Sequence, residues 1–220
     1  PMRPCPSTWT RLAILLCVAT APCAAADAGA AVDADWILQA VARPAPSRTA
    51  FVELRDSPML RQPLRLEGEY RREADGRLVR EVNAPYAETT ALAAGEAVVE
   101  RAGRAPRRIA LRQVPELAAV QAGFGALLGG DRELLRQTYQ TEASGQHGRW
   151  QLRLLPRDPR LAASLQRIDL FGSGDELRCV ENHPAKGPPQ RTLMGEAAAA
   201  ATGLDDAVAL AALCHGEPAP

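Results

Sequence analysis

Few side chains in this sequence are placed to do chemistry. The only lysine, Lys186, lies among proline and glycine residues, where neither a Schiff base nor a phosphate-binding loop is expected. The three histidines are scattered: His147 stands between glycines, His183 precedes a proline, and His215 is near the end of the chain. No pair has the spacing of a motif such as H-x-x-x-H, and C-x-x-C is absent. The sequence therefore predicts no metal site and no cofactor.

Candidate nucleophiles are equally poor. The triplet Gly172-Ser173-Gly174 imitates part of G-x-S-x-G, but it lies between two expected strands and not before a helix. Most carboxylates alternate with arginines, which we interpret as solvated charge on strand faces. Gly129-Gly130-Asp131 could bind an anion, although the end of one helix and the cap of the next explains it better. We predict that the protein is not an enzyme. An esterase is the enzymatic alternative.

The N-terminal segment has the pattern of a secretory signal. Arg3 and Arg11 precede the apolar run 12–18, and small residues follow up to Ala24-Ala25-Ala26. The run is too short to span a bilayer, and A-x-A is typical of a cleavage site. We expect residues 1–26 to be removed and residues 27–220 to form one exported, soluble domain. A short N-terminal anchor is the alternative.

The cysteine count changes with that cleavage. Cys5, Cys17 and Cys23 leave with the signal, so that Cys179 and Cys214 remain. An even pair in an oxidising compartment predicts one disulfide, which would tie the last segment to an internal strand. Two buried free thiols are the alternative.

Composition excludes one class of partner. The chain carries 26 Lys+Arg and 26 Asp+Glu residues, so its formal net charge is zero. Nucleic-acid binding needs a basic excess or a basic stripe, and we therefore expect no nucleic acid as a partner. At 220 residues the chain is long enough for one domain with a proper core.

The first half of the mature chain predicts a helix and then a sheet. Residues 33–43 place apolar side chains on one helical face. In Leu64–Tyr70 apolar and charged residues alternate, which is typical of an antiparallel sheet with one wet face. Turn signals such as Asp75-Gly76 recur at short intervals. Phe51 to Arg112 thus predicts a meander of about six strands.

The second half starts with an apolar helical stretch. Residues 114–136 carry a stripe that includes Leu117, Val120, Phe124 and Leu127, and Gly129-Gly130 ends the first helix. Alternation then resumes around Trp150, Leu152 and Leu154, and three more strands follow, at 167–170, 177–181 and 190–195. An alanine-rich helix is expected at 204–214.

This order of elements resembles the LolA-like periplasmic lipoprotein carrier family, from Trp36 to about Gly195. The residues that carry the resemblance are Arg48-Thr49-Ala50-Phe51-Val52-Glu53, Leu66-Glu67-Gly68-Glu69-Tyr70, Leu78-Val79-Arg80-Glu81-Val82-Asn83-Ala84-Pro85-Tyr86, Ala126-Leu127-Leu128-Gly129-Gly130-Asp131, Trp150-Gln151-Leu152-Arg153-Leu154-Leu155-Pro156 and Arg191-Thr192-Leu193. The resemblance implies a mainly β (α+β) fold, in which an antiparallel sheet curves into an unclosed half-barrel under a helical lid.

The resemblance also implies a function. The cavity of the family holds acyl chains, so we expect a periplasmic carrier, acting as a monomer, for lipid-modified proteins or acylated lipids, with inner- and outer-membrane transfer partners. A lipid-sensing module on the same scaffold is the alternative. The expected cavity lining consists of Leu64, Leu66, Tyr70, Leu117, Val120, Phe124, Leu127, Trp150, Leu152 and Leu154.

Three departures from the family are visible. The arginine that latches the family's lid would fall at Ala74, with Arg71 and Arg72 nearby. The family's tryptophan in the next strand would fall at Arg80. The C-terminal helix and the expected bridge between Cys179 and Cys214 are additions.

Overall fold

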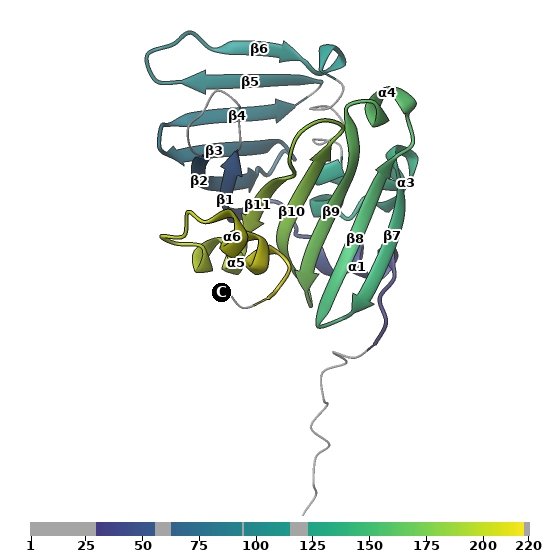
Figure 1. Cartoon of the computed structure of the whole chain (residues 1–220). Coiled ribbons are helices and arrows are strands. Elements are labelled where there is room, and N and C mark those ends of the chain that lie inside the picture. Colours follow the sequence, from purple (N-terminus) through teal and green to yellow (C-terminus); the bar gives the residue numbers. More distant parts are fainter. Residues whose placement is uncertain (1–29, 56–62, 94, 115–122, 218–220) are drawn as a thin grey trace, which may run out of the picture.

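The computed structural model describes residues 30–55, 63–93, 95–114 and 123–217 (Figure 1). The predicted signal at 1–26 lies outside these residues. In the described part of the chain, no helix combines the length and the hydrophobicity needed to cross a membrane.

One antiparallel sheet of 11 strands dominates the fold, in the order β6-β5-β4-β3-β2-β1-β11-β10-β9-β8-β7. The strands are β1 (Ser47–Arg55), β2 (Leu64–Arg72), β3 (Leu78–Ala84), β4 (Glu88–Ala93), β5 (Glu96–Arg101), β6 (Arg107–Ala110), β7 (Tyr139–Gln146), β8 (Arg149–Pro156), β9 (Leu165–Ser173), β10 (Glu176–Pro184) and β11 (Gln190–Met194). The first half is the predicted six-strand meander. Its strand β1 pairs with the last strand, β11, at the centre of the sheet. The two ends of the sheet are β6 and β7, so the sheet stays open, as the resemblance implies.

The helices are short and lie on both sides of the sheet. They are α1 (Ala34–Val41), α3 (Arg132–Thr138), α4 (Pro159–Ala162), α5 (Gly195–Ala200) and α6 (Ala207–Cys214), with a 3-10 turn at Leu111–Gln113 and helical residues at 123–129. In Figure 1, α5 and α6 cover one side of β1, β10 and β11, whereas α1 and α3 lie on the other side of the sheet.

Several predicted boundaries shift for local reasons. The C-terminal helix begins at Ala207 and not at 204, because the Asp206 side chain accepts a hydrogen bond from the Ala209 N–H at 2.9 Å and caps the helix there. Asp131 caps α3 in the same way, as predicted. The strand expected at Arg107–Arg112 ends at Ala110. Strand β7 and the helices α4 and α5 are not in the sequence prediction.

The two faces of the sheet carry separate cores. The inner face, defined by Phe51, Leu66, Leu152, Leu170 and their neighbours, packs against α1 and residues 126–127. The outer face, defined by Val52, Cys179, Leu193 and their neighbours, packs against α5 and α6. Because side chains alternate along a strand, every central strand contributes to both cores.

Candidate functional site

The inner face holds the predicted lining residues, and most of them are packed in its core. Those within the described residues belong to the inner-face cluster or pack against it: Leu64, Leu66, Tyr70, Phe124, Leu127, Trp150, Leu152 and Leu154. Leu117 and Val120 lie outside the described residues. Trp150 also donates its indole N–H to the Gly174 carbonyl at 2.9 Å, and its ring covers Gly172, where a Cβ would lie 2.0 Å from the indole. Gly172 thus makes room for the ring of Trp150.

A cavity of about 110 Å³ remains between the two halves of the sheet, beneath Phe124. Of the predicted lining residues, only Tyr70 and Phe124 border it. The other bordering residues are Leu78, Arg80, Thr90, Leu92, Val180, Asn182, Thr192 and Met194. The space corresponds to about four water molecules by liquid volume, so a whole acyl chain does not fit in this closed state.

Two members of a row of aromatic rings, Tyr70 and Phe124, border the cavity. The rings of Phe124 and Tyr70 lie 4.9 Å apart, and those of Tyr70 and Phe51 lie 5.0 Å apart. Gly68 makes room for this row: a Cβ there would lie 1.8 Å from the Glu81 carbonyl oxygen and 3.0 Å from the Phe51 ring. Phe124 thereby joins the helical residues 123–129 to the sheet over the cavity, while Ala126 and Leu127 of the same helix are buried in the inner-face core.

An arginine from β2 holds the C-terminal end of that helix. Arg72 donates hydrogen bonds to the carbonyl oxygens of Leu128 at 3.2 Å and Arg43 at 3.0 Å. The Arg43 N–H donates to the same Leu128 carbonyl at 3.0 Å. The sequence comparison placed Ala74 at the latch position and Arg72 only nearby. In the structure Arg72 contacts the helix, because it shares the inner face with Tyr70 whereas Ala74 is already in the turn.

The sequence analysis missed a buried ion-pair cluster on the inner face. Arg80 donates to Glu53 Oε2 at 2.7 Å, and Arg55 donates to Glu53 Oε1 at 2.8 Å. Glu53 is 5% exposed. The guanidinium of Arg80 also lies over the Phe51 ring, 4.6 Å from its centre. A signal was present in the sequence, since Arg80 shares its face of β3 with the apolar residues Leu78 and Val82.

The pKa of the Tyr70 hydroxyl is raised, because burial outweighs the opposing charge of Arg80. Tyr70 therefore remains protonated and can donate a hydrogen bond at physiological pH. Nearby, Asn182 Oδ1 is buried without a hydrogen-bond partner. The cavity wall is thus apolar with a few polar groups at one place.

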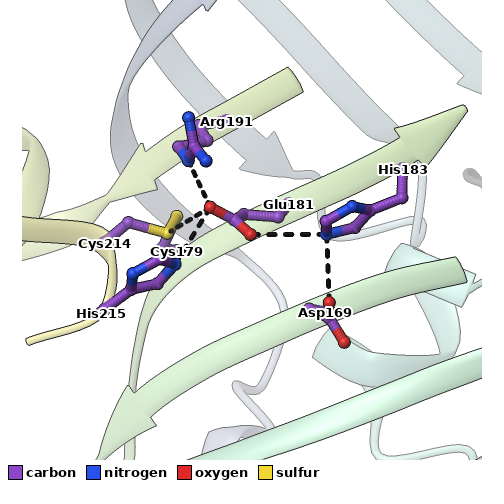
Figure 2. Close-up of a disulfide and its surroundings, with 7 residues drawn as sticks. All are labelled: Asp169, Cys179, Glu181, His183, Arg191, Cys214 and His215. Carbon is purple, nitrogen blue, oxygen red and sulfur yellow. Dashed lines mark hydrogen bonds and ion pairs between the residues drawn. A yellow bond between two sulfur atoms is a disulfide. The ribbon is translucent and has the colours of Figure 1, made fainter. Parts of the chain in front are cut away.

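The outer face carries a second cluster of charges (Figure 2). Glu181 contacts Arg191, His215 at 3.1 Å and His183 at 3.4 Å. Asp169 is 2% and Glu181 is 4% exposed, so the prediction that strand carboxylates are solvated is wrong at these two positions. Glu181 lies against Cys214 and His215 at the end of α6, whereas Asp169 is enclosed by the side chains of Arg153, Arg167 and His183. Beside them, Cys179 and Cys214 form a disulfide.

This outer cluster neutralises itself. Asp169 accepts hydrogen bonds from Arg153 at 2.9 Å and Arg167 at 2.8 Å. Burial opposes ionisation, but these two arginines outweigh it and lower the pKa of Asp169. Burial, together with Arg167, lowers the pKa of His183. Asp169, Glu181 and His183 have the donor atoms for a metal ion, yet the surrounding arginines already occupy the carboxylates and would repel a cation.

The outer face also has a larger hollow, of about 660 Å³, but its chemistry differs. Its walls include Arg149, Arg153, Arg167, Arg178 and Asp169. Hydrocarbon does not favour such a charged surface, because burying unpaired charge is costly. The smaller cavity on the inner face is the better candidate for an acyl ligand.

Comparisons with known proteins show the family of the chain. Residues 25–217 match the family described as outer membrane lipoprotein carrier protein LolA-like. Among solved structures, the chain is similar to a LolA superfamily protein, NE2245, from Nitrosomonas europaea, with 12% identity, a TM-score of 0.40, and coverage of 74% of this chain and 91% of that one. It is also similar to LprF from Mycobacterium bovis, with 10% identity, a TM-score of 0.32, and coverage of 73% and 90%. No curated protein matches the sequence. Since the family match spans residues 25–217 of the 220, the protein belongs to the LolA-like family of outer membrane lipoprotein carrier proteins.

Proposed function

We propose that the protein carries the acyl chains of lipids or lipid-modified proteins through the periplasm, in the inner-face cavity. The observation that supports this most directly is the cavity itself, which lies between the two halves of the sheet and is closed by Phe124. Membership in the LolA-like family supports the same ligand class.

Binding of this kind needs apolar area and no reaction. Each buried methylene contributes about 0.8 kcal/mol, so a chain of moderate length binds firmly without any catalytic group. The closed cavity of about 110 Å³ holds only a short part of such a chain. Loading therefore requires the helix at 123–129 to move away from the sheet.

The contacts of that helix suit such a movement. At one end Phe124 meets Tyr70 ring to ring, and at the other Arg72 donates to the Leu128 carbonyl. The Arg72 contact is a hydrogen bond at the helix end, where carbonyl groups have no partner within the helix and can be hydrated after opening. Separation of the helix would expose Ala126 and Leu127, which are buried in the inner-face core, so the burial of the acyl chain has to compensate for that loss.

The finer parts of the proposal follow from the family and the N-terminal pattern. Residues 1–26 direct export, and the mature chain receives its cargo at the inner membrane and delivers it toward the outer membrane. Lipid-modified proteins are the proposed cargo. A lipid-sensing module would bind the same chains but would not release them to an acceptor membrane.

The test compares two aspartate substitutions on the inner face. Phe124→Asp places a charge where hydrocarbon must lie, so the loaded state loses several kcal/mol. In the unloaded protein the helix can shift and hydrate the charge, so the melting temperature falls little. Leu152→Asp is the control, because Leu152 is fully buried in the closed core and cannot be hydrated without unfolding.

The measurements are thermal unfolding and the binding of a fluorescent fatty acid, on the same preparations. Retained melting with lost binding in Phe124→Asp, beside collapse in Leu152→Asp, supports a carrier. If both variants unfold alike, Phe124 belongs to a fixed core and the proposal is wrong.

A further inference from the structure

The wall of the cavity contains one charged side chain, Arg80, among the described residues that line it. It comes from the middle of β3, where its neighbours on the same face, Leu78 and Val82, are buried apolar residues. Its side chain is only 14% exposed. An arginine removed from water in this way is costly, and an apolar side chain of similar volume would line a pure hydrocarbon site at lower cost. The position of Arg80 therefore indicates a ligand that carries a polar or charged group in addition to its hydrocarbon chain.

The charges around Arg80 do not balance. Glu53 is shared by two guanidinium groups, Arg80 at 2.7 Å and Arg55 at 2.8 Å. Among the described residues, one carboxylate faces two arginines here, which leaves one positive charge in excess. The next ion pair on this face, Glu88 with Arg101, is neutral in itself. An anion that enters the cavity would thus find uncompensated positive charge, and Glu53 would keep Arg55 as its partner.

Two hydroxyl groups, which can donate hydrogen bonds to an anion, belong to residues on the same wall. They are those of Tyr70 and Thr192. A planar guanidinium forms paired hydrogen bonds with the two oxygens of a carboxylate or phosphate. Arg80 with these neighbours has the composition of a site for such a group.

We propose that the cavity binds an acyl ligand whose anionic head, a carboxylate or a phosphate, lies inside the protein against Arg80. This inference rests on the proposed function, because it names the ligand class of the same cavity. The ligand enters with its head toward the floor, and its chain extends under Phe124. A neutral acyl group, such as an ester-linked chain, is the weaker ligand.

The test measures dissociation constants of the delipidated full-length mature protein for three probes with the same chain: hexadecanoate, hexadecyl phosphate and methyl hexadecanoate. We expect at least one of the two anions to bind about tenfold more tightly than the methyl ester. A factor of this size corresponds to one charged hydrogen bond. The stronger anion identifies the head group. Arg80→Met should bring the ratio of anion to ester affinity down to about one.

Two further variants sharpen this test. Glu53→Gln removes the competing carboxylate and should raise the ratio above that of the wild type. Arg153→Met is the matched control, because Arg153 also pairs with a buried carboxylate, Asp169, but on the outer face. It should leave the ratio unchanged. If Arg80→Met does not fold, Glu53→Gln still tests the proposal, because it is expected to raise the ratio of anion to ester affinity where Arg80→Met would lower it.

The outcomes separate the two proposals. Equal binding of ester and anions by the wild type, or a ratio that Arg80→Met and Glu53→Gln leave unchanged, overturns the anionic ligand and leaves the carrier intact. Failure to bind all three probes overturns the carrier function itself.

Discussion

The two faces of the central sheet both bury carboxylates beside arginines, but the two clusters differ in their charge and in what surrounds them. Each buries a carboxylate and surrounds it with arginines: Glu53 on the inner face, Asp169 and Glu181 on the outer face. On the outer face, three arginines form ion pairs with three carboxylates, those of Asp169, Glu181 and Glu142. A disulfide holds α6, the helix that packs on this face. On the inner face two arginines meet one carboxylate, beside a cavity.

The difference indicates that the two faces have different roles. The outer face is covalently closed and its buried carboxylates are paired, which suits a support. The inner face has, among its described residues, one arginine more than carboxylates around Glu53, together with a cavity and a cover held by noncovalent contacts, which suits a site that opens. If this contrast is real, damage to the outer face should reduce stability, and damage to the inner face should alter ligand binding.

Removing the disulfide should give the largest effect on stability. The bridge closes a loop across 35 residues, and in the loop-entropy model its loss costs about 4 kcal/mol. We therefore expect Cys179→Ala/Cys214→Ala to lower the free energy of unfolding by about that amount, measured by urea denaturation. The reduced wild type serves as the control and should show a similar loss. The fraction that remains folded should bind fatty acid as the wild type does. A weaker affinity in that fraction would show that the faces are coupled.

Weakening the cover of the cavity should have a smaller effect on stability. Arg72→Met removes two hydrogen bonds to the carbonyl oxygens of Leu128 and Arg43, which costs about 1–3 kcal/mol. Hydrogen exchange should accelerate at residues 123–130 and remain slow in β9 and β10. Arg71→Met is the neighbouring control, because Arg71 points away from the helix and pairs with Glu81 at 3.3 Å. Equal rates of hydrogen exchange at residues 123–130 in the two variants would contradict the prediction that Arg72 holds this helix on the sheet.

The smallest expected effect is the response of the outer face to acid. The pKa of His183 lies below its usual value of about 6.5, mainly because the ring is buried. The unfolded chain then binds the proton more readily, so stability falls as the pH drops below about 6.5. The lowered pKa of Asp169 adds a second loss below about pH 4. Urea unfolding between pH 7.5 and pH 5 should show a flatter profile for His183→Gln. A profile that keeps the wild-type slope would contradict this origin.

The fold was largely predictable, because most strands alternate strongly. Leu64–Tyr70 and the stretch around Trp150 and Leu152 show a period of two with little ambiguity. Strand β7 escaped because Tyr139–Gln146 carries few apolar residues and lies at the edge of the sheet, where only one neighbour is needed. Helix α5 escaped because a run of alanines has no amphipathic period.

The site was predictable only in its apolar part. Phe124 and Tyr70 stand on apolar stripes and border the cavity. Arg80 and Glu53 were missed because each was interpreted by the alternation of charges alone. That alternation assigns charge to the wet face, whereas the Arg80 side chain passes over the Phe51 ring and reaches Glu53 on the buried face. Long-range pairing of this kind is not visible in local patterns.

The pairing of β1 with β11 has a consequence for how the chain folds. These neighbours at the centre of the sheet come from opposite ends of the mature chain, so the contact order is high and folding is expected to be slow. Until Gln190–Met194 has been synthesised, β1 and β10 both present unpaired edges in the middle of the molecule, and such edges are templates for aggregation. The nascent chain therefore needs protection until its last strand arrives, and truncation just before β11 should be far more harmful than the loss of the residues that follow α6.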